Sequence, residues 1–303
     1  MSQLVSTPAV SSYQHELAGL IERHTSMDGK HNTAIPDLCF RRASQVSEPT
    51  NTMNIPALYV IAQGSKTAIF AGESYRCDSA AYMVSSVHLP VIARITDASP
   101  QLPYLSLQLT LTPDVMLDIV KKTRPLGSGE TGRGLLVNQS TPPLLDAILR
   151  LVKLLDTPMD IEMLAPLIIR EIFYRVMQGE QGALLRQFAV IGSYAQSISE
   201  AIHLINRNYT EPLVIEELAR TVSMSPTALH KHFKKVTAMS PLQYQKVIRL
   251  QKARQLLLTE GLDAATAGFR VGYESPSQFS REYARTFGRP PMSDIKHLRD
   301  TRI

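Results

Sequence analysis

Two short segments in the C-terminal third carry the residues best suited to binding a polyanion. The first reads SPTALHKHFKK and spans residues 225–235, and the second reads SPSQFSREYAR and spans residues 275–285. In register they share a Ser-Pro start, two large apolar or aromatic residues and two basic residues. Serine followed by proline is typical of a helix N-terminus, with the serine as the cap. We therefore predict one small helical unit that is used twice.

Each unit has one apolar face and one polar, basic face. Leu229 and Phe233 lie four residues apart and must share the buried side of the first helix. Phe279 and Tyr283 have the same spacing in the second. The side chains left on the outward face are Thr227, His230, Lys231 and Lys234 in the first unit, and Ser277, Ser280, Arg281 and Arg285 in the second.

The segment before each unit predicts a short helix and a tight turn, which completes a helix–turn–helix. In the first unit the helix covers residues 214–222 and Ser223 begins the turn. Gly272 takes the equivalent place in the second unit and suits an unusual backbone angle. The two turns are therefore expected to differ. In such a motif the second helix lies in the DNA major groove, with its N-terminal residues against base edges.

The basic residues suit different tasks on DNA. Arg281 can hydrogen-bond a guanine edge in bidentate fashion, a contact that contributes about 1–3 kcal/mol of discrimination. Lys231 is less suited to bases and could serve a phosphate instead. His230 is either a contact to a base or phosphate, or a surface histidine with no task. The residues expected to hold phosphates are Lys234, Lys235 and Arg285.

A long helical segment, PLQYQKVIRLQKARQLLLTEG, lies between the two units at residues 241–261. It starts with proline, ends at glycine and carries apolar residues at helical spacing. Twenty helical residues span about 30 Å, close to the 34 Å or so of one turn of B-DNA. A rod of this length would let one chain read two successive segments of the major groove.

Composition and charge agree with a DNA-binding half joined to a neutral half. The chain has 303 residues, enough for two domains, and 44% are hydrophobic, which excludes a wholly disordered protein. The net charge is +5, and residues 196–303 hold 16 basic residues against 10 acidic ones. Such a basic domain fits nucleic acid as partner, although a solvated charged face would have the same composition.

The N-terminal half predicts a β-structure followed by helices. Residues 10–24 have helical spacing, and residues 38–111 mix short β-prone runs with glycine and proline, as in a small barrel or sandwich. Two helical segments after Pro113 have broad apolar stripes that could close the barrel, pair with a second chain, or both. We find no signal peptide and no apolar run near 18 residues, so we expect a cytoplasmic protein without membrane contact. The fold class predicted is α+β.

The C-terminal pattern resembles the tandem helix–turn–helix domain of AraC/XylS-family transcription regulators. The resemblance rests on IEELARTVSMSPTALHKHFKKVTAMSPLQYQKVIRLQKARQLLL and VGYESPSQFSREYARTFGRPP. At Ala267–Gly268 the family usually has Ile–Ala, and glycine costs a helix about 1 kcal/mol relative to alanine, so the second unit is expected to be less rigid. The family's base-contact positions fall on Thr227, His230, Lys231, Pro276, Ser277, Ser280 and Arg281, with only an apolar contact open to Pro276.

The N-terminal half is similar to the N-terminal domain of one AraC-type subgroup. The matching runs are TAIPDLCFRRAS, YVIAQGSKTAIFAGESYRCD and SVHLPVIARITDASPQLPYLSLQL. The resemblance implies a cupin-like barrel with flanking helices that senses a small molecule or mediates dimerisation. The expected domains are residues 1–180 for this part, 181–196 for a linker and 197–303 for DNA binding.

A cupin-like barrel could also be a metal-dependent enzyme. Metal cupins carry closely spaced histidines and a carboxylate on neighbouring strands, whereas this half has His15, His24, His31 and His88, with no H-x-H pair. We find no catalytic triad and no glycine-rich phosphate loop. We therefore predict no catalytic residue, no metal site and no cofactor, and keep the metal enzyme as an alternative.

The two cysteines are too few for a disulfide framework or a zinc cluster. Cys39 or Cys77 could instead sense an oxidant or electrophile, provided that the thiol is exposed and its pKa is lowered. Cys39 is close in sequence to Arg41 and Arg42, which would favour a thiolate. The alternative is that both are small apolar residues in the barrel wall.

Together these features predict a DNA-binding transcription regulator, more readily an activator than a repressor on family resemblance. Its expected partners are double-stranded operator DNA and RNA polymerase, and a small-molecule effector and a homodimer are both left open. An architectural protein that binds DNA without sequence preference is the alternative from another class. It would show affinity that falls steeply with salt.

Overall fold

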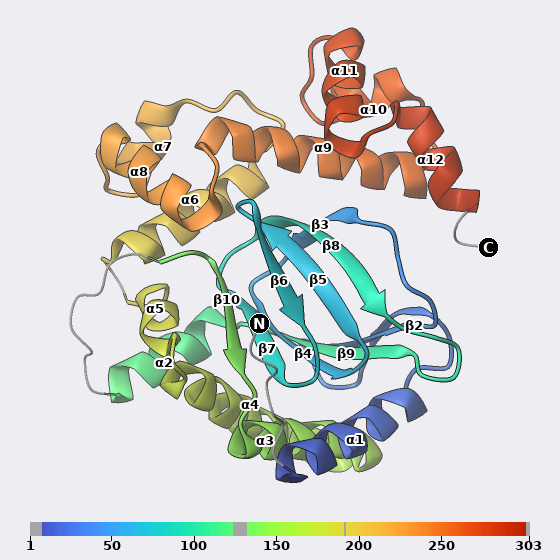
Figure 1. Ribbon diagram of the computed structural model, residues 1–303. Coiled ribbons are helices and arrows are strands. Elements are labelled where there is room, and N and C mark those ends of the chain that lie inside the picture. Colours follow the sequence, from blue (N-terminus) through green and yellow to red (C-terminus); the bar gives the residue numbers. More distant parts are fainter. Residues whose placement is uncertain (1–7, 124–131, 191, 301–303) are drawn as a thin grey trace. The chain divides into compact units, whose positions relative to one another are not determined.

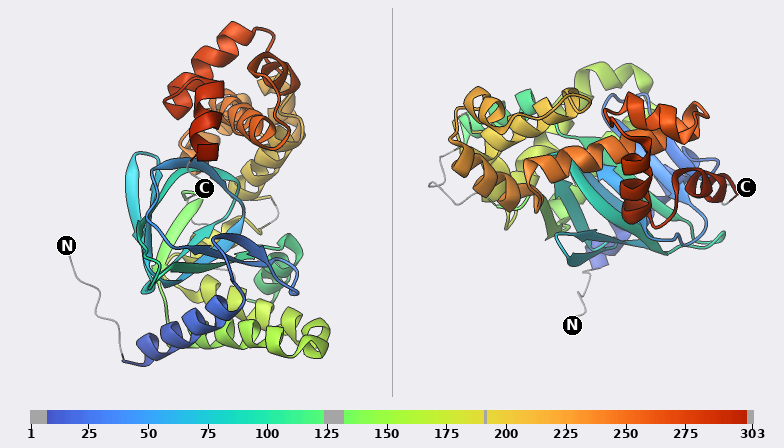
Figure 2. Two further views of the ribbon diagram at one scale, coloured as in Figure 1. Left: turned by 90° about the vertical axis from the view of Figure 1, so that its right-hand side faces the viewer. Right: turned by 90° about the horizontal axis from the view of Figure 1, so that it is seen from above.

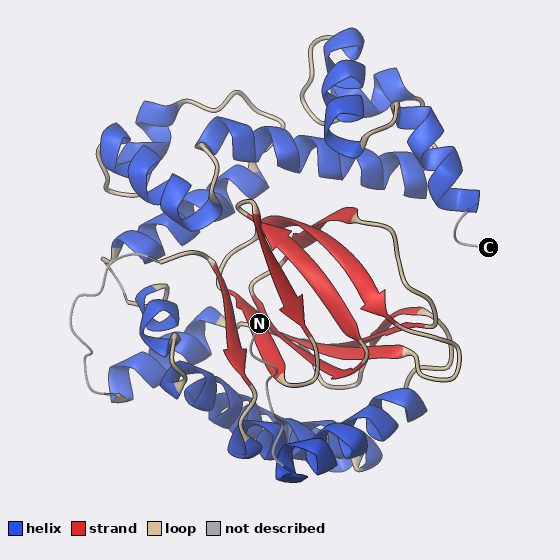
Figure 3. Ribbon diagram, viewed as in Figure 1, coloured by secondary structure: helices blue, strands red, loops and turns tan. Residues whose placement is uncertain are grey.

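The chain folds as two compact units, with the boundary after Gln196. Strands with flanking helices make up the N-terminal half of the computed structural model, and helices follow to the C-terminus (Figure 3). This order confirms the α+β class predicted from the sequence. The structure describes residues 8–123, 132–190 and 192–300.

The first unit contains a six-stranded sheet in the order β1-β2-β9-β4-β7-β10 and a four-stranded sheet in the order β3-β8-β5-β6 (Figure 1). The pairs within the six-stranded sheet are antiparallel, and so are those of β5 with β6 and β8. The strands are β1 (Gly29–Asn32), β2 (Leu38–Ala43), β3 (Thr50–Asn54), β4 (Ala57–Gln63), β5 (Ser65–Phe70), β6 (Glu73–Cys77), β7 (Ala81–Ser85), β8 (Leu89–Asp97), β9 (Tyr104–Thr110) and β10 (Leu135–Gln139).

Strand β9 is buried on both of its faces. Leu105, Leu107 and Leu109 alternate onto one face and join the core beneath the helices. The opposite face is buried as well, since Tyr104 is 1% exposed and Ser106 is 8% exposed. The four-stranded sheet covers this second face, because Lys66 of β5 contacts the ring of Tyr59 on β4, the neighbour of β9. The alternation of these leucines is by itself typical of a half-buried strand, but a strand between helices and another sheet is buried on both faces.

Helices α1, α3 and α4 lie on one side of the sheets (Figure 2). Helix α3 begins with two prolines after Thr141 and buries residues around much of its circumference, so it is a core helix. Helix α4 buries Ile172, Phe173 and Val176 and leaves another face exposed. The helices of this unit are α1 (Pro8–Arg23), α2 (Pro113–Lys122), α3 (Pro142–Lys153), α4 (Ile161–Gln178) and α5 (Gly182–Gln187), with 3-10 turns at Leu154–Asp156 and Pro158–Asp160.

The structure extends the predicted β-region at both ends and orders part of the expected linker. Strand β10 lies beyond residues 38–111 and pairs with β7, with Leu135 opposite Ser85. Its five residues come after helix α2, too short a run for a period-2 pattern to stand out. Within residues 181–196, α5 forms a helix whose Leu185 is 1% exposed and belongs to the first core.

The second unit is built from helices joined by short turns (Figure 1). Its C-terminal part packs around a core that includes Leu250 and Leu257 of the long helix α9, with Phe279 and Tyr283 from α11. No helix that the structure describes has the length and apolar character needed to cross a bilayer. The helices are α6 (Tyr194–Arg207), α7 (Ile215–Thr221), α8 (Pro226–Thr237), α9 (Pro241–Thr259), α10 (Ala264–Arg270), α11 (Pro276–Phe287) and α12 (Pro291–Asp300).

Candidate nucleic-acid interface

Helices α7 and α8 form the first helix–turn–helix. The hydroxyl of Ser225 accepts a hydrogen bond from the backbone N–H of Ala228 at 3.2 Å, and Pro226 takes the first helical position. Leu229 and Phe233 are fully buried, as their spacing predicted. The cap fixes the residue at which α8 begins. The two buried side chains fix the rotation of α8 about its axis, so that one face points outward.

Helices α10 and α11 repeat the arrangement. Asp263 caps α10, since one carboxylate oxygen accepts from the backbone N–H groups of Ala265 at 2.9 Å and Thr266 at 3.0 Å. Ser275 caps α11 by accepting from the backbone N–H of Gln278 at 3.3 Å. Phe279 is fully buried, like Leu229 at the matching position of α8.

The two turns begin alike but differ in length, as expected: residues 222–225 separate α7 from α8, and residues 271–275 separate α10 from α11. Ser223 has φ of 56° and Gly272 has φ of 88°, both in the left-handed region. The N–H of Met224 donates to Ala219 O at 2.8 Å, and the N–H of Tyr273 donates to the equivalent Gly268 O at 3.0 Å. Ser223 therefore adopts, with some strain, a left-handed conformation that Gly272 adopts without strain.

Gly268 is a site of close helix packing. A Cβ at this position would lie 3.0 Å from Cγ of Phe279, so the missing side chain lets α10 approach α11. The aromatic ring that fills this space is fully buried and meets Tyr273 and Tyr283 edge to face. This packing gives the glycine a structural reason that helix propensity does not consider, and the lower rigidity expected of the second helix–turn–helix stays a prediction.

The predicted DNA-facing side chains lie on the outer faces of α8 and α11. Most are exposed, and Pro276 and Ser280 are partly buried near the start of α11. The structure therefore groups the residues by helix, as their spacing predicted, and their individual contacts to DNA stay predictions. The exposed set is Thr227, His230, Lys231, Lys234 and Lys235 on α8, with Ser277, Arg281 and Arg285 on α11.

Helix α9 joins the two helix–turn–helix motifs, and its N-terminus is well capped. Ser240 and Gln243 form a capping box in which each side chain accepts a hydrogen bond from the other's backbone N–H, at 3.3 and 3.0 Å. The helix has 19 residues, which corresponds to about 28 Å at 1.5 Å or so per residue. Figure 1 shows α9 passing from the α7–α8 pair to the α10–α11 pair.

Sequence reasoning missed the polar contacts that hold α11 in place. Arg254 on α9 donates two hydrogen bonds to the carboxylate of Asp294 on α12, at 2.8 and 2.9 Å. The hydroxyl of Tyr283 on α11 donates to the same carboxylate at 2.8 Å. Glu282 of α11 pairs with Lys246 of α9 at 3.0 Å. Both Arg254 and Asp294 are visible in the sequence, but nothing in it indicates that two residues 40 positions apart form a pair.

Comparison with known families agrees with this architecture. Residues 34–184 match the family model described as the AraC-type transcriptional regulator N-terminus, and residues 218–296 match a helix-turn-helix domain. The chain belongs to the AraC family of transcription regulators. The second match covers both helix–turn–helix units, so the resemblance predicted from the sequence is confirmed.

Relatives of this regulator share one or both halves. The lactose operon transcription activator of Staphylococcus xylosus is 23% identical over 231 residues, which cover 76% of this chain and 80% of that protein. The regulator ArgR of Pseudomonas aeruginosa is 30% identical over 125 residues, 41% of this chain and 38% of that protein. Among solved structures, ToxT of Vibrio cholerae superposes with a TM-score of 0.58 at 15% identity, covering 85% of this chain and 97% of that one. That similarity confirms the cupin-like fold with a C-terminal helical domain.

Between the two sheets, the AraC-type domain holds a lysine that faces inward. The ammonium of Lys66 on β5 lies 5.0 Å from the ring centroid of Tyr59 on β4, so this contact spans the sheets. Its neighbours in register, Cys77 and Ile95, are both buried. Burial lowers the pKa of Lys66 to about 8, and the nearby Arg41 also lowers it. Among the residues described, no carboxylate forms an ion pair with this lysine.

The structure places both cysteines in the interior. Cys39 is 8% exposed and Cys77 is 2% exposed, and burial raises the pKa of both thiols. The cation that acts on Cys39 is Lys30, not the arginines that follow it in sequence. The two conditions set for a thiol sensor, exposure and a lowered pKa, are therefore not met in this conformation. The sensor role stays a prediction.

The N-terminal histidines are dispersed. His24 lies 3.6 Å from a carboxylate oxygen of Asp156, and His31 is hydrogen-bonded to Met27 O at 2.7 Å. His15 is exposed on α1. Within the described ranges no three His, Cys, Asp or Glu side chains come together in a way that could hold a metal ion.

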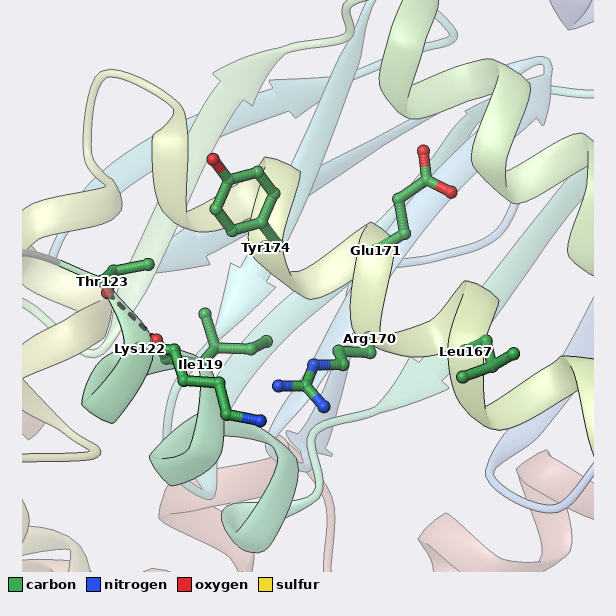
Figure 4. A pocket seen from close by; sticks show the side chains of 7 residues that line it. All are labelled: Ile119, Lys122, Thr123, Leu167, Arg170, Glu171 and Tyr174. Carbon is green, nitrogen blue, oxygen red and sulfur yellow. Dashed lines mark hydrogen bonds between the residues drawn. The ribbon is translucent and has the colours of Figure 1, made fainter.

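A surface pocket of about 320 Å³ lies between α2 and α4 (Figure 4). Helix α4 exposes large apolar side chains at a spacing of four: Met163 is 74% exposed, and Leu167, which lines the pocket, is 64% exposed. The 3-10 turn before the helix continues the stripe with Met159, which is 93% exposed. Helix α3 is therefore buried in the core of the first half, whereas α4 leaves an apolar stripe exposed to solvent. The pocket is lined by Ile119, Lys122, Thr123, Leu167, Arg170, Glu171 and Tyr174.

Proposed function

We propose that this AraC-family regulator reads two DNA submotifs about one helical turn apart, one with α8 and one with α11. The observation that carries this proposal is the repetition of one motif. Both recognition helices begin with a Ser-Pro cap, both follow a turn that contains a residue in the left-handed region, and both are anchored by two buried large residues. In such motifs the second helix inserts into the major groove.

Selection from a random pool of double-stranded DNA at near-physiological salt would test this reading. We expect enrichment of two short submotifs whose centres are about 10 base pairs apart. Enrichment of one submotif would mean that one unit only grips the phosphate backbone. Binding without enrichment, with affinity that falls steeply as salt rises, would replace the proposal by an architectural DNA-binding protein.

Within this function the contacts divide between bases and backbone. The base contacts proposed are those of the exposed N-terminal residues of each helix, and the phosphate contacts are those of Lys234, Lys235 and Arg285. Support comes from their position on the outward faces, opposite the buried anchors. Pro276 can offer only an apolar surface, for example to a thymine methyl group.

A small-molecule effector is the second part of the proposal, and Lys66 indicates its chemistry. A cation that faces the interior without a carboxylate partner is costly, and an anionic ligand would offset that cost. We therefore infer that the AraC-type domain takes a small carboxylate or a similar anion between its sheets. One solved structure of ToxT from Vibrio cholerae has an unsaturated fatty acid bound, which is a carboxylate on a similar fold.

A calorimetric titration would test the effector proposal with defined probes. Aliphatic and aromatic monocarboxylates should bind more tightly than the primary alcohols of the same skeleton, and Lys66→Met should abolish the difference. Equal binding of acid and alcohol by the natural protein, or a preference that survives Lys66→Met, would contradict an anion site at this lysine.

The exposed stripe of α4 supports a homodimer. Two α4 helices packed antiparallel would bury Met163 and Leu167 of both copies, and would bring Glu162 of one copy near Arg170 of the other. Sedimentation velocity should show a dimer at micromolar concentration that Leu167→Glu converts to monomer. A monomer in the natural protein would rule this surface out as a dimer interface.

The regulator would act in the cytoplasm, where it meets promoter DNA and RNA polymerase, and without a catalytic function of its own. Activation is proposed because a relative that aligns over 76% of this chain is described as a transcription activator. A promoter–reporter assay with the selected DNA site would decide between activation and repression. Lower expression in the presence of the protein would contradict the proposed sign.

A further inference from the structure

Two polar side chains of α9 turn toward the loop between α6 and α7. Gln245 and Arg249 are four residues apart and therefore lie on one face of the helix. The amide of Gln245 donates to Tyr209 O at 3.2 Å and to Glu211 O at 2.7 Å. Both acceptors belong to the loop that leads into the first helix–turn–helix, so Gln245 ties α9 to the first unit alone.

Arg249 contacts the same loop and also reaches the second unit. Its Nε donates to Tyr209 O at 2.6 Å, and its Nη2 donates to Thr210 O at 3.1 Å and Glu211 O at 3.0 Å. Its Nη1 donates to Gly272 O at 2.8 Å, in the turn between α10 and α11. One guanidinium therefore holds backbone carbonyls of the loop that leads into the first helix–turn–helix and of the turn inside the second.

The backbones of the two units meet at this point. A Cβ at Gly272 would lie 2.2 Å from Thr210 O, closer than any real contact allows. Gly272 thus serves the turn through its positive φ of 88° and also lets the two segments touch. Of the two turn residues, only Gly272 is in contact with the other unit, whereas its counterpart Ser223 is exposed.

This contact is a second connection between the two helix–turn–helix motifs, in addition to α9 itself. A single helix of 19 residues bends gently about its middle at low cost, and bending would change the distance between the recognition helices. The link from the α6–α7 loop through Arg249 to the α10–α11 turn braces α9 at that middle. Arginine suits the task because its planar fork carries five N–H donors, whereas lysine has three on one rotatable ammonium.

We propose that Arg249 is a positioning residue that fixes the spacing and phase of the two recognition helices on DNA. The inference rests on the proposed two-unit reading of the operator. Arg249 is not expected to touch DNA. Its effect should appear in how strictly the spacing between the submotifs is read, and not in how each submotif is recognised.

The experiment compares DNA duplexes in which the selected submotifs are moved closer or apart by one or two base pairs. Two linked readers gain affinity by a factor on the order of 100 when both can engage at once, and the natural protein should lose this gain at a shifted spacing. In Arg249→Lys the loss should shrink to about tenfold or less, with unchanged affinity for duplexes that carry one submotif.

Gln245→Met is the matched control, because it removes hydrogen bonds to the same loop without touching the second unit. It should lower thermal stability yet keep the strict spacing profile. A strict profile in Arg249→Lys, or a profile relaxed equally by Gln245→Met, would overturn the role of Arg249. If the natural protein gains nothing from the second submotif at any spacing, the two-unit reading itself fails and the inference falls with it.

Discussion

Asp294 is the point at which three helices of the DNA-binding unit are joined. Its carboxylate is 3% exposed and receives two hydrogen bonds from Arg254 and one from Tyr283. Arg254 also lies 4.5 Å from the ring centroid of Phe287, at the end of α11. The recognition helix of the second unit is therefore held from its inner side by a buried ion pair, while its outer side stays available for DNA.

Asp294→Ala should destabilise the protein by about 3–5 kcal/mol, because removing one partner of a buried pair leaves the other charge uncompensated. Urea unfolding of the natural protein and the variant would measure the difference. Lys296→Ala is the matched control, since Lys296 is exposed on the same helix, and should change stability by less than about 0.5 kcal/mol. A loss below about 1 kcal/mol in Asp294→Ala would show that the pair is solvated in solution.

The two turn residues provide a paired test of backbone strain. Ser223→Gly should stabilise the protein by up to about 1 kcal/mol, because a left-handed conformation costs an L-residue about 1–2 kcal/mol and glycine loses part of this gain to unfolded-state entropy. Gly272→Ala should destabilise it by more than about 2 kcal/mol, since strain adds to the clash with Thr210 O. Thermal unfolding followed by circular dichroism would measure both. Equal effects of the two changes would contradict the close approach at Gly272.

Arg281 and Lys235 should differ in what their loss does to DNA binding. Arg281→Ala should cost about 1–3 kcal/mol and relax specificity at one base pair, as expected for a base contact. Lys235→Ala should weaken binding to all sequences alike and reduce the salt slope by about 1. Competition binding on selected and random DNA would separate the two. Equal losses on both DNAs for Arg281→Ala would refute its base-reading role.

The cysteines should be slow to react. Burial raises the pKa of both thiols, so alkylation by iodoacetamide at pH 7 should be at least about tenfold slower than for an unhindered thiol. Mass spectrometry of the native protein over time would measure the rate. Rapid modification, together with a regulatory response that is lost in Cys39→Ser or Cys77→Ser, would revive the sensor role; a response retained in both variants would end it.

The sequence predicted most of the helical unit because its signals are local. Ser225, Pro226 and the spacing of Leu229 and Phe233 define a capped amphipathic helix within nine residues. What the sequence did not predict are contacts whose partner is distant in sequence. The packing role of Gly268 was missed because it depends on a ring eleven residues away.

Long-range contacts also explain what sequence reasoning could not find in the N-terminal unit. The inward direction of Lys66 depends on the pairing of β5 with β6 and β8 and on the sheet that faces them. A lysine in the run GSKTAIF looks like an ordinary exposed residue of an edge strand until that register is known. Strand β10 depends likewise on β7, which lies about fifty residues earlier.

The titration of Lys66 makes the effector proposal testable by pH. The groups that act on its ammonium are Arg41 on β2 and Cys77 on β6, with the Tyr59 ring of β4 above it. Since the pKa of Lys66 is lowered to about 8, the lysine is charged at pH 7, and affinity for a monocarboxylate should fall as the pH rises through 8. Lys66→Met should show weak binding at every pH.

The same shift predicts how stability changes with pH when no ligand is present. The folded pKa of Lys66 lies below its unfolded value, so desolvation of the charge destabilises the fold below pH 8, and the partial exposure of the side chain keeps this penalty under about 3 kcal/mol. This penalty disappears as the pH rises from about 8 to about 10.5, where the unfolded chain binds more protons than the folded one. Lys66→Met should therefore be more stable than the natural protein at pH 7, with a difference that shrinks toward pH 10. A variant that is less stable at pH 7 would show that the ammonium already has a favourable partner in solution.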